Sequence, residues 1–285
     1  MEQKSQQRMV FRFMKYDLIA LDLDGTALGP GSVVRPAVRE AVAWARARGC
    51  RVVISTGRIC GEAAEFAGKL GTDDLMVTAG GATLSSASRN ACTMRISIPW
   101  EPAVRAAAVV ERIGMTSMIY AAESLLITPY DEMYFSRYKT NEGFLESKQV
   151  ERSVAEYIAT QHLSVDKIFC RSRDPILLNF ARRQIEQIPG VRVMSSADDN
   201  IEVISPLADK GRALGMLCQE LGTSLDRCIA MGDSENDLEM LAAVGMPVAM
   251  GNATDEVKRL ARYITATNAE DGVAQAIYHL LGDGL

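Results

Sequence analysis

Histidine is scarce in this chain. Only two occur among its 285 residues, His162 and His279, and both fall in segments that we expect to be helical or to end a helix. Two histidines cannot form a multi-histidine metal centre, and they leave little material for a Ser-His-Asp triad. The chemistry of this protein must therefore depend on carboxylates, lysine and hydroxyl groups.

Paired cysteines and long apolar runs are also missing. The six cysteines are scattered and include no Cys-x-x-Cys pair, which speaks against a zinc site and against a disulfide framework. No run approaches the roughly 18 uninterrupted apolar residues of a membrane span, and the N-terminus lacks the apolar core of a signal peptide. We therefore expect a cytoplasmic protein with free thiols and no membrane segment.

Charge of one sign does not gather in any part of the chain. The net charge of −5 is spread along the sequence, without the long basic block that follows a phosphate backbone. This speaks against nucleic acid as a partner. Coiled-coil heptads are absent as well, and the sequence leaves the oligomeric state open.

Hydrophobic residues make up 48% of the chain, which is enough for one large core or two. Residues 1–13 are polar and basic without periodicity, and we expect a flexible N-terminal extension there. Further on, short apolar runs that end in polar or glycine residues alternate with helical patterns, which is typical of a parallel sheet with covering helices. The expected strands are Leu18 to Leu23, Arg51 to Ile54, Leu75 to Thr78, Cys228 to Met231 and Pro247 to Met250.

The middle of the chain has a different pattern, since its β-like runs mostly lack polar ends. We expect helices from residue 101 onward, near 150–161 and over 175–188, and strands over 116–121, 124–128, 166–170, 191–195 and 201–204. The sequence therefore predicts an α/β protein in two parts. Residues 14–97 and 207–285 form a doubly wound core, and residues 98–206 form an inserted α+β domain.

Two aspartates stand at the end of the first apolar run, in Leu21-Asp22-Leu23-Asp24-Gly25-Thr26. Alternate strand residues share a face, so both carboxylates are expected on one side of the strand's carboxyl end, where open parallel sheets bind ligands. Asp-Gly is also a strong turn pair, which accounts for Asp24 alone. Because ionised carboxylates are almost never fully buried without a partner, Asp22 indicates a bound cation or reaction chemistry.

Polar residues at the ends of other core elements extend this pattern. They are Ser55 and Thr56 after the second strand, Lys210 in Ala208-Asp209-Lys210-Gly211, and Asp233, Asn236 and Asp237 in Gly232-Asp233-Ser234-Glu235-Asn236-Asp237. Converging carboxylates with hydroxyl and lysine donors make an oxygen-lined site suited to Mg²⁺ and a substrate phosphate. Phosphoryl transfer with an aspartate nucleophile fits these residues.

Taken together, these motifs resemble the haloacid dehalogenase superfamily and, within it, the Cof-type phosphatases with a large type II cap. The resemblance extends from Met14 to about Leu281. It is carried by four ordered motifs, which are Asp22-Leu23-Asp24-Gly25-Thr26, Ser55-Thr56-Gly57-Arg58, Lys210-Gly211 and Gly232-Asp233-Ser234-Glu235-Asn236-Asp237. Met250-Gly251-Asn252-Ala253 and Asp271-Gly272-Val273-Ala274 look like later signatures of the same group.

The resemblance implies a mechanism. Asp22 would attack phosphorus, and Asp24 would protonate the leaving alcohol and then activate water. Mg²⁺ would be held by Asp22, by the backbone carbonyl of Asp24 and by Asp233, with Asp237 supporting the metal site. The implied phosphate- and substrate-binding residues are Ser55, Thr56, Gly57, Lys210, Asn236 and Asn252.

Simpler interpretations stay open for some of these residues. Ser234 and Asp237 are spaced as a capping box, so Asp237 has either a structural role or direct metal contact. Lys210 alone would be an ordinary solvated lysine at a helix start. The family commonly has Asn-Gly after its third strand, whereas this chain has Gly80-Gly81, so a contact made by that asparagine is in doubt here.

The expected function is Mg²⁺-dependent hydrolysis of a small phosphorylated metabolite, such as a sugar phosphate, nucleotide or cofactor phosphate, through an aspartyl phosphate. A phosphosugar mutase or phosphotransferase on the same core is one alternative, and a non-catalytic phosphometabolite-binding module is another. The segment from Tyr130 to Lys139 has two interpretations, namely a substrate contact from the inserted domain or ordinary packing and surface.

Overall fold

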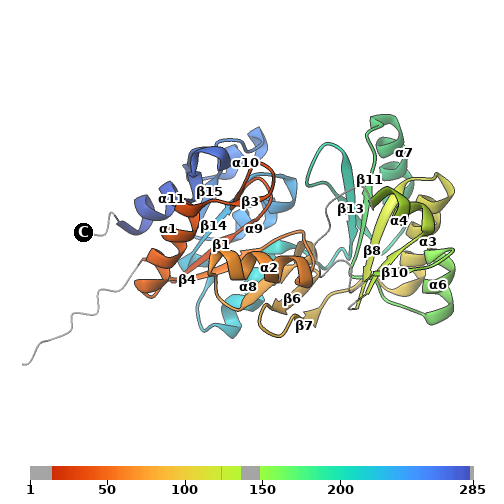
Figure 1. Ribbon diagram of the computed structural model, residues 1–285, viewed down its shortest axis with the longest axis horizontal. Coiled ribbons are helices and arrows are strands. Elements are labelled where there is room, and N and C mark those ends of the chain that lie inside the picture. Colours follow the sequence, from red (N-terminus) through yellow and green to blue (C-terminus); the bar gives the residue numbers. More distant parts are fainter. Residues whose placement is uncertain (1–14, 123, 136–147, 283–285) are drawn as a thin grey trace, which may run out of the picture.

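Two sheets organise the protein in the computed structural model, which describes residues 15–122, 124–135 and 148–282. An eight-stranded sheet lies on the left of Figure 1 and a six-stranded sheet on the right. Residues 1–13, where the sequence predicts a flexible extension, lie outside the described residues.

The larger sheet has a parallel centre. Its strand order is β16-β15-β14-β1-β4-β5-β6-β7, and only the β5–β6 and β6–β7 pairs are antiparallel. This confirms the predicted α/β class. The strands are β1 Leu18–Leu21, β4 Arg51–Ser55, β5 Leu75–Thr78, β6 Thr83–Ser86, β7 Ala91–Arg95, β14 Cys228–Gly232, β15 Met246–Ala249 and β16 Tyr263–Ile264, and a small hairpin pairs β2 Leu28–Gly29 with β3 Val33–Val34.

Helices pack against this sheet and against one another. Helix α1 contacts α2 and α11, while α8 contacts α9 and β5. The helices are α1 Pro36–Ala47, α2 Cys60–Leu70, α8 Lys210–Glu220, α9 Leu238–Ala243, α10 Asp255–Leu260 and α11 Gly272–Gly282. All four residues of the central strand β1 are fully buried, as expected for a strand covered on both faces.

Several details differ from the sequence prediction, among them the end of β1 and the edge of the larger sheet. Strand β1 ends at Leu21 rather than at Leu23, because the chain turns back after Asp22, whose carbonyl accepts the N–H of Ala27 at 3.1 Å. Strands β6 and β7 were not predicted, since their short, partly polar sequences lack a clear period-two pattern. They extend the larger sheet as an antiparallel hairpin at its edge.

The smaller sheet has the order β10-β9-β8-β11-β13-β12 and is antiparallel apart from the β9–β10 pair. Its apolar core lies between one face of the sheet and helices α3, α6 and α7. The elements are α3 Trp100–Arg112, β8 Thr116–Ala121, β9 Ser124–Ile127, α4 Pro129–Phe135, β10 Lys148–Val150, α6 Val154–Gln161, β11 Lys167–Arg171, α7 Pro175–Glu186, β12 Arg192–Met194 and β13 Asn200–Ile204.

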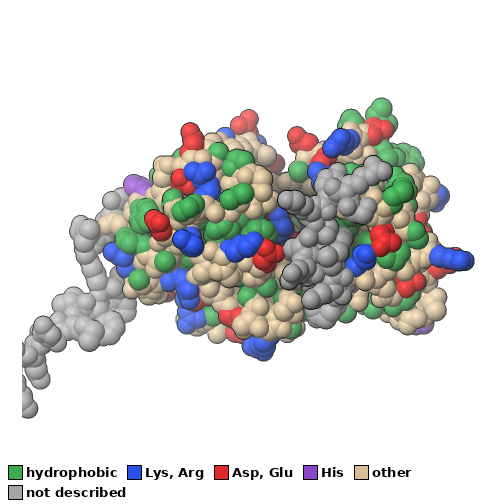
Figure 2. Space-filling model, viewed as in Figure 1, with side chains coloured by type: hydrophobic (Ala, Val, Ile, Leu, Met, Phe, Trp, Pro, Cys, Tyr) green, Lys and Arg blue, Asp and Glu red, His purple; other side chains and the backbone are tan. Residues whose placement is uncertain are grey.

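The face of the described chain seen in Figure 2 shows no concentration of one charge. Figure 2 shows acidic and basic side chains interspersed over the visible face. In the described part of the chain, the helices are all too short or too polar to cross a bilayer.

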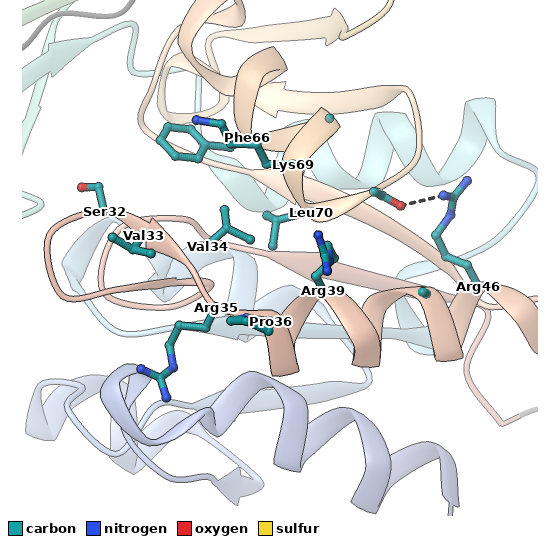
Figure 3. Close-up of a pocket in the computed structure, with 13 residues that line it drawn as sticks. Ser32, Val33, Val34, Arg35, Pro36, Arg39, Arg46, Phe66, Lys69 and Leu70 are labelled. Carbon is teal, nitrogen blue, oxygen red and sulfur yellow. Dashed lines mark hydrogen bonds between the residues drawn. The ribbon is translucent and has the colours of Figure 1, made fainter.

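A groove between α1 and α2 has a volume of about 860 Å³. Figure 3 shows Phe66 and Leu70 on one side of it and Arg39 on the other, while Arg46 donates to the carbonyl of Gly71 at 2.6 Å. The residues that line this groove include no carboxylate. Its ionisable side chains are those of lysine and arginine, so the groove offers no carboxylate for a metal ion or for acid–base chemistry.

Gly81 fixes the approach of the β5–β6 connection to helix α8. Its φ is +92°, and a Cβ built there would lie 2.2 Å from the backbone carbon of Asp209, the N-cap residue of α8. Only glycine combines this backbone conformation with so close a contact. The start of α8, which carries Lys210, is thereby set against the sheet.

We expect the substitution Gly81→Ala to lower the free energy of unfolding by about 3 kcal/mol or more, since it adds left-handed strain to a steric clash. Gly68→Ala is the matched control, because it lies within helix α2 with nothing near its Cβ position, and it should raise stability by up to about 1 kcal/mol. Urea unfolding of both variants measures the difference. Equal stabilities would contradict the close packing at Gly81.

Candidate active site

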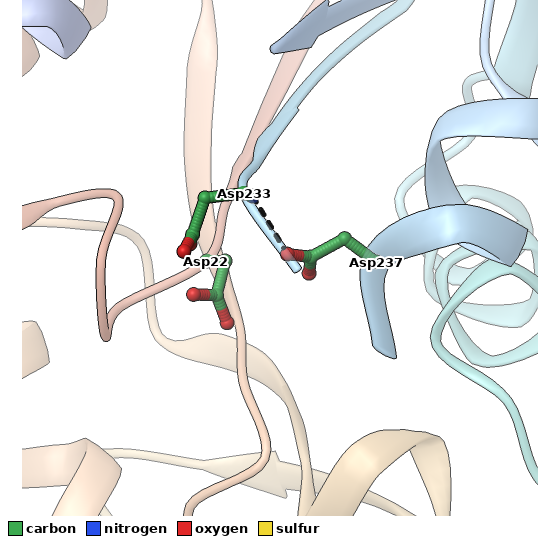
Figure 4. Close-up of side chains that lie close together, drawn as sticks. All are labelled: Asp22, Asp233 and Asp237. Carbon is green, nitrogen blue, oxygen red and sulfur yellow. Dashed lines mark hydrogen bonds between the residues drawn. The ribbon is translucent and has the colours of Figure 1, made fainter. Parts of the chain in front are cut away.

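Three carboxylates meet at the carboxyl end of the larger sheet (Figure 4). Asp22 follows β1 and Asp233 follows β14, and these strands pair in parallel with Leu21 opposite Met231. Asp237 comes from a 3₁₀ turn at Glu235–Asp237 that leads into α9. One oxygen from each carboxylate lies within 4.8 Å of the others. The strand register therefore brings together residues more than 200 positions apart.

Lys210 is buried among these carboxylates as the first residue of α8. Its Nζ lies 2.7 Å from Asp22 Oδ1 and 2.7 Å from Asp237 Oδ1. Burial lowers the pKa of Lys210, but the two carboxylates outweigh this effect and raise it above its ordinary value, so the ammonium stays charged. Lys210 is therefore part of the site and is not a solvated lysine at a helix start.

The acidic groups outnumber the single ammonium. Burial raises the pKa of Asp22 well above its ordinary value, with Lys210 opposing and Asp237 and Asp233 reinforcing the shift. Burial and the charge of Asp237 raise the pKa of Asp233 to about 7. Three carboxylates beside one lysine leave an excess of negative charge that a divalent cation would neutralise.

Asp237 has both carboxylate oxygens engaged within the protein. Oδ1 accepts from Lys210, while Oδ2 accepts the backbone N–H groups of Asp233 at 2.9 Å and Ser234 at 3.2 Å. With Ser234 it forms the capping box that the spacing suggested. These bonds fix the loop that carries Asp233 and hold Lys210 in place.

The loop after β1 is fitted closely around Asp233. Thr26 Oγ1 donates to Asp233 Oδ1 at 2.9 Å. Gly25 has φ +80°, and a Cβ there would lie 2.3 Å from Asp233 Oδ2. Asn252 Nδ2 donates to the carbonyl of Gly25 at 2.9 Å. Asn252 thus supports this loop, and it is not among the residues that line the adjacent cavity.

Asp24 lies on the open side of the site. Its carboxylate accepts two bonds from the Arg58 guanidinium, each 2.7 Å long, and more than half of its side chain is exposed. Such a bidentate pair fixes the orientation of the carboxylate as well as its position. The sequence analysis named Arg58 only as part of a motif, and no local pattern links it to a residue 34 positions away.

A cavity of about 630 Å³ opens between these residues and the smaller sheet. Of the residues that the sequence singled out, five line it, namely Asp22, Asp24, Thr56, Gly57 and Asn236. Thr56 Oγ1 accepts the N–H of Arg58 at 3.2 Å. Ser55 does not line the cavity, and its buried Oγ has no hydrogen-bond partner among the described residues. Strand β4 ends at Ser55, and the next residue, Thr56, lines the cavity.

The smaller sheet reaches the site through Lys167, which the sequence analysis did not identify. Its Nζ donates to the carbonyl of Gly57 at 2.7 Å and lies 2.7 Å from Glu202 Oε2, with both side chains buried. Phe135, from the segment 130–139, also lines the cavity, whereas residues 136–139 lie outside the described residues. No sequence signal marks Lys167, because it lies alone at the start of an expected strand.

Gly80 stands where the family commonly has asparagine. Its φ of +69° lies in the left-handed region, which glycine and asparagine tolerate better than other residues. A Cβ there would meet only Ile204 Cγ2, at 4.0 Å. Gly80 therefore adopts this conformation without strain and contributes no side chain at this position.

Replacing Lys210 by methionine tests the charged network. Lys210→Met leaves Asp22 and Asp237 buried without their cation, so we expect the free energy of unfolding in EDTA-treated buffer to fall by about 3–5 kcal/mol. In the control Lys69→Met, which breaks the exposed pair with Glu65, it should fall by less than about 1 kcal/mol. Urea titration measures both. A Lys210→Met protein as stable as the control would argue against a charged network.

The chain is similar to known proteins over most of its length. A family model described as haloacid dehalogenase-like hydrolase matches residues 19–277. The 5-amino-6-(5-phospho-D-ribitylamino)uracil phosphatase YcsE of Bacillus subtilis is 33% identical over 265 residues, which cover 92% of this chain and 94% of the relative. The pyridoxal phosphate phosphatase YbhA of Escherichia coli is 28% identical and covers 93% of this chain and 98% of its own length.

Solved structures show the same fold. A haloacid dehalogenase-like hydrolase from Bacillus subtilis superposes with a TM-score of 0.81 at 26% identity, covering 93% of this chain and 100% of its own. The family model covers most of the chain, and the order of the motifs around Asp22, Thr56, Lys210 and Asp233 follows the family pattern. The chain therefore belongs to the haloacid dehalogenase-like hydrolases and, within them, to the Cof-type phosphatases.

Proposed function

We propose that this protein hydrolyses a small phosphorylated metabolite in a Mg²⁺-dependent reaction that passes through a phosphoryl group on Asp22. The observation that carries the proposal is the cluster of Asp22, Asp233 and Asp237 around Lys210, beside a cavity of about 630 Å³. A cavity of this size suits a metabolite and is too small for a folded protein substrate.

The donor set fits Mg²⁺. Carboxylate and carbonyl oxygens are the ligands that this ion prefers, and it commonly takes one or two carboxylates together with substrate phosphate. Asp22, Asp233 and the backbone carbonyl of Asp24 would hold it. Asp237, whose two oxygens are engaged with Lys210 and backbone N–H groups, would position the loop. When bound, Mg²⁺ neutralises charge on the phosphoryl oxygens.

Asp22 acts as the nucleophile in this proposal. One carboxylate oxygen attacks phosphorus, a new P–O bond forms, and the bond from phosphorus to the leaving oxygen breaks. Lys210, fixed on Asp22 Oδ1, holds that carboxylate in position and adds positive charge beside the phosphoryl group. Thr56, which lines the same cavity, would donate its hydroxyl proton to a phosphoryl oxygen.

Asp24 serves the leaving group and then water. Its carboxyl donates a proton to the departing alcohol oxygen, and the resulting carboxylate takes a proton from the water that attacks the phosphoryl group on Asp22. Arg58, which donates a hydrogen bond to each oxygen of Asp24, orients the carboxyl for both steps.

The smaller sheet would cover the active-site cavity. We propose residues 98–206 as a cap domain over a core of residues 14–97 and 207–285. Lys167, bonded to the carbonyl of Gly57, would couple closure of the cap to the loop that carries Thr56. Closure excludes bulk water and strengthens the electrostatic interactions in the site.

A phosphate-release assay with the variant Asp22→Asn tests the function. Wild type should release phosphate from members of a panel of sugar phosphates, nucleotides and cofactor phosphates when Mg²⁺ is present, and excess EDTA should abolish the release. Asp22→Asn keeps the shape and removes the nucleophilic charge, so activity should fall by at least about 10³-fold. Asp226→Asn, at an exposed position, should retain full activity.

Product analysis separates hydrolysis from transfer. In water enriched in ¹⁸O, attack of water on phosphorus places one ¹⁸O atom in the released phosphate. Transfer to a second alcohol forms a new phosphate ester and releases no inorganic phosphate. A folded wild-type protein that binds Mg²⁺ but neither releases phosphate nor forms a transfer product from any tested ester would overturn the proposed function.

A further inference from the structure

One face of the smaller sheet looks into the cavity. Period-two alternation along β8, β11 and β13 divides their side chains between two environments. The residues between those that face the cavity, such as Ile119, Ile168 and Ile201, pack under helices α3, α6 and α7. The residues on the cavity face are Met118 and Tyr120 of β8, Lys167, Phe169 and Arg171 of β11, and Asn200 and Glu202 of β13.

The strand register arranges this face in rows. Lys167 lies opposite Tyr120, and Phe169 lies between Met118 on β8 and Glu202 on β13. Lys167 bonds to the carbonyl of Gly57 and so marks the end of the face that adjoins the phosphoryl site. Phe169 is two residues further along β11, about 7 Å from Lys167. A bound ester would thus meet Lys167 near its phosphoryl end and Phe169 further away.

The middle of the face is flat and apolar. Phe169 and Met118 are half-buried and line the cavity, and Tyr120 and Phe135 are buried in the same apolar cluster. The Tyr120 hydroxyl donates to the sulfur of Met118 at 3.6 Å, and the Lys167 ammonium lies 5.6 Å from the centre of the Phe169 ring. Aromatic rings and methionine sulfur favour contact with another flat ring. They offer no hydrogen bonds to the hydroxyl groups of a sugar.

A hydrogen-bond acceptor borders this surface. Glu202 Oε1 accepts from the hydroxyl of Ser196 at 2.7 Å, and Oε2 lies 2.7 Å from Lys167 Nζ. A carboxylate has about four acceptor positions, so Glu202 can accept a further N–H from a ligand. It is also close to the phosphoryl loop, since a Cβ on Gly57 would lie 3.6 Å from Glu202 Oε1.

We propose that this face selects phosphate esters whose alcohol carries a planar nitrogen heterocycle on a short carbon chain. The ring stacks on Phe169 and Met118, and a ring N–H donates to Glu202. The short chain spans the distance between the phosphoryl site and the ring. This inference rests on the proposed phosphatase function and adds the substrate class that the cavity favours.

Uridine 5′-monophosphate and ribose 5-phosphate form a matched pair of probes, because they share the phosphate and the ribose and differ in the heterocycle. With Mg²⁺ present, we expect kcat/KM for the nucleotide to exceed that for the sugar phosphate by at least about tenfold, which is the range that stacking of one base supplies. Phe169→Ala should remove this preference by lowering kcat/KM for the nucleotide much more than kcat/KM for ribose 5-phosphate.

Two further variants control for misfolding and for effects unrelated to the ring. Phe169→Leu keeps most of the buried volume and loses the ring, so it should lower the preference even if the alanine variant folds poorly. Phe180→Ala, at an exposed position on α7, is the matched control and should change neither rate. Calorimetric titration with uridine and ribose tests the ring contact without turnover, and only uridine should bind to the wild-type protein.

The outcomes are distinct. Equal kcat/KM for the two esters, or a preference that survives in both Phe169 variants, would overturn the inference while leaving the phosphatase function intact. Hydrolysis of neither ester, joined with uridine binding that Phe169→Ala removes, would support the heterocycle subsite and count against the proposed function. Absence of uridine binding together with absence of turnover would overturn both.

Discussion

The buried ammonium of Lys210 is the group on which the rest of the structure depends. A charge taken out of water is costly unless it is paired and hydrogen-bonded, and Lys210 meets this condition through Asp22 and Asp237. Each partner comes from a different element, and helix α8 can bring the lysine to them only because Gly81 permits its close approach. The geometry of the site therefore depends directly on how the core packs.

The same cluster explains the division of labour among the carboxylates. Asp237 is bonded at both oxygens and serves the loop and the lysine, whereas Asp22 lines the cavity and Asp233 is held by Thr26. Burial raises the pKa of Asp22 and of Asp233. A divalent cation would neutralise the excess negative charge of these acidic groups.

The two faces of the smaller sheet have different roles. Its helix-covered face follows ordinary apolar packing, while its other face combines Phe169 and Met118 with the buried pair of Lys167 and Glu202. Lys167 bonds to the backbone beside Thr56. The Lys167 side chain thus connects the smaller sheet to the loop that is proposed to hold phosphate.

The sequence alone determined the α/β alternation, the positions of Asp22 and Asp233 at the ends of apolar runs, and the family, because strand periodicity and motif spacing are local properties of the chain. It did not determine the Arg58 pair with Asp24, the contact from Lys167 to Gly57, the position of Ser55 outside the cavity wall or the use of Asn252 as a loop support. These depend on strand register and on how closely distant segments approach. Only the tertiary structure decides such contacts. A polar group that is removed from water forms its hydrogen bond with a partner that the fold brings close to it.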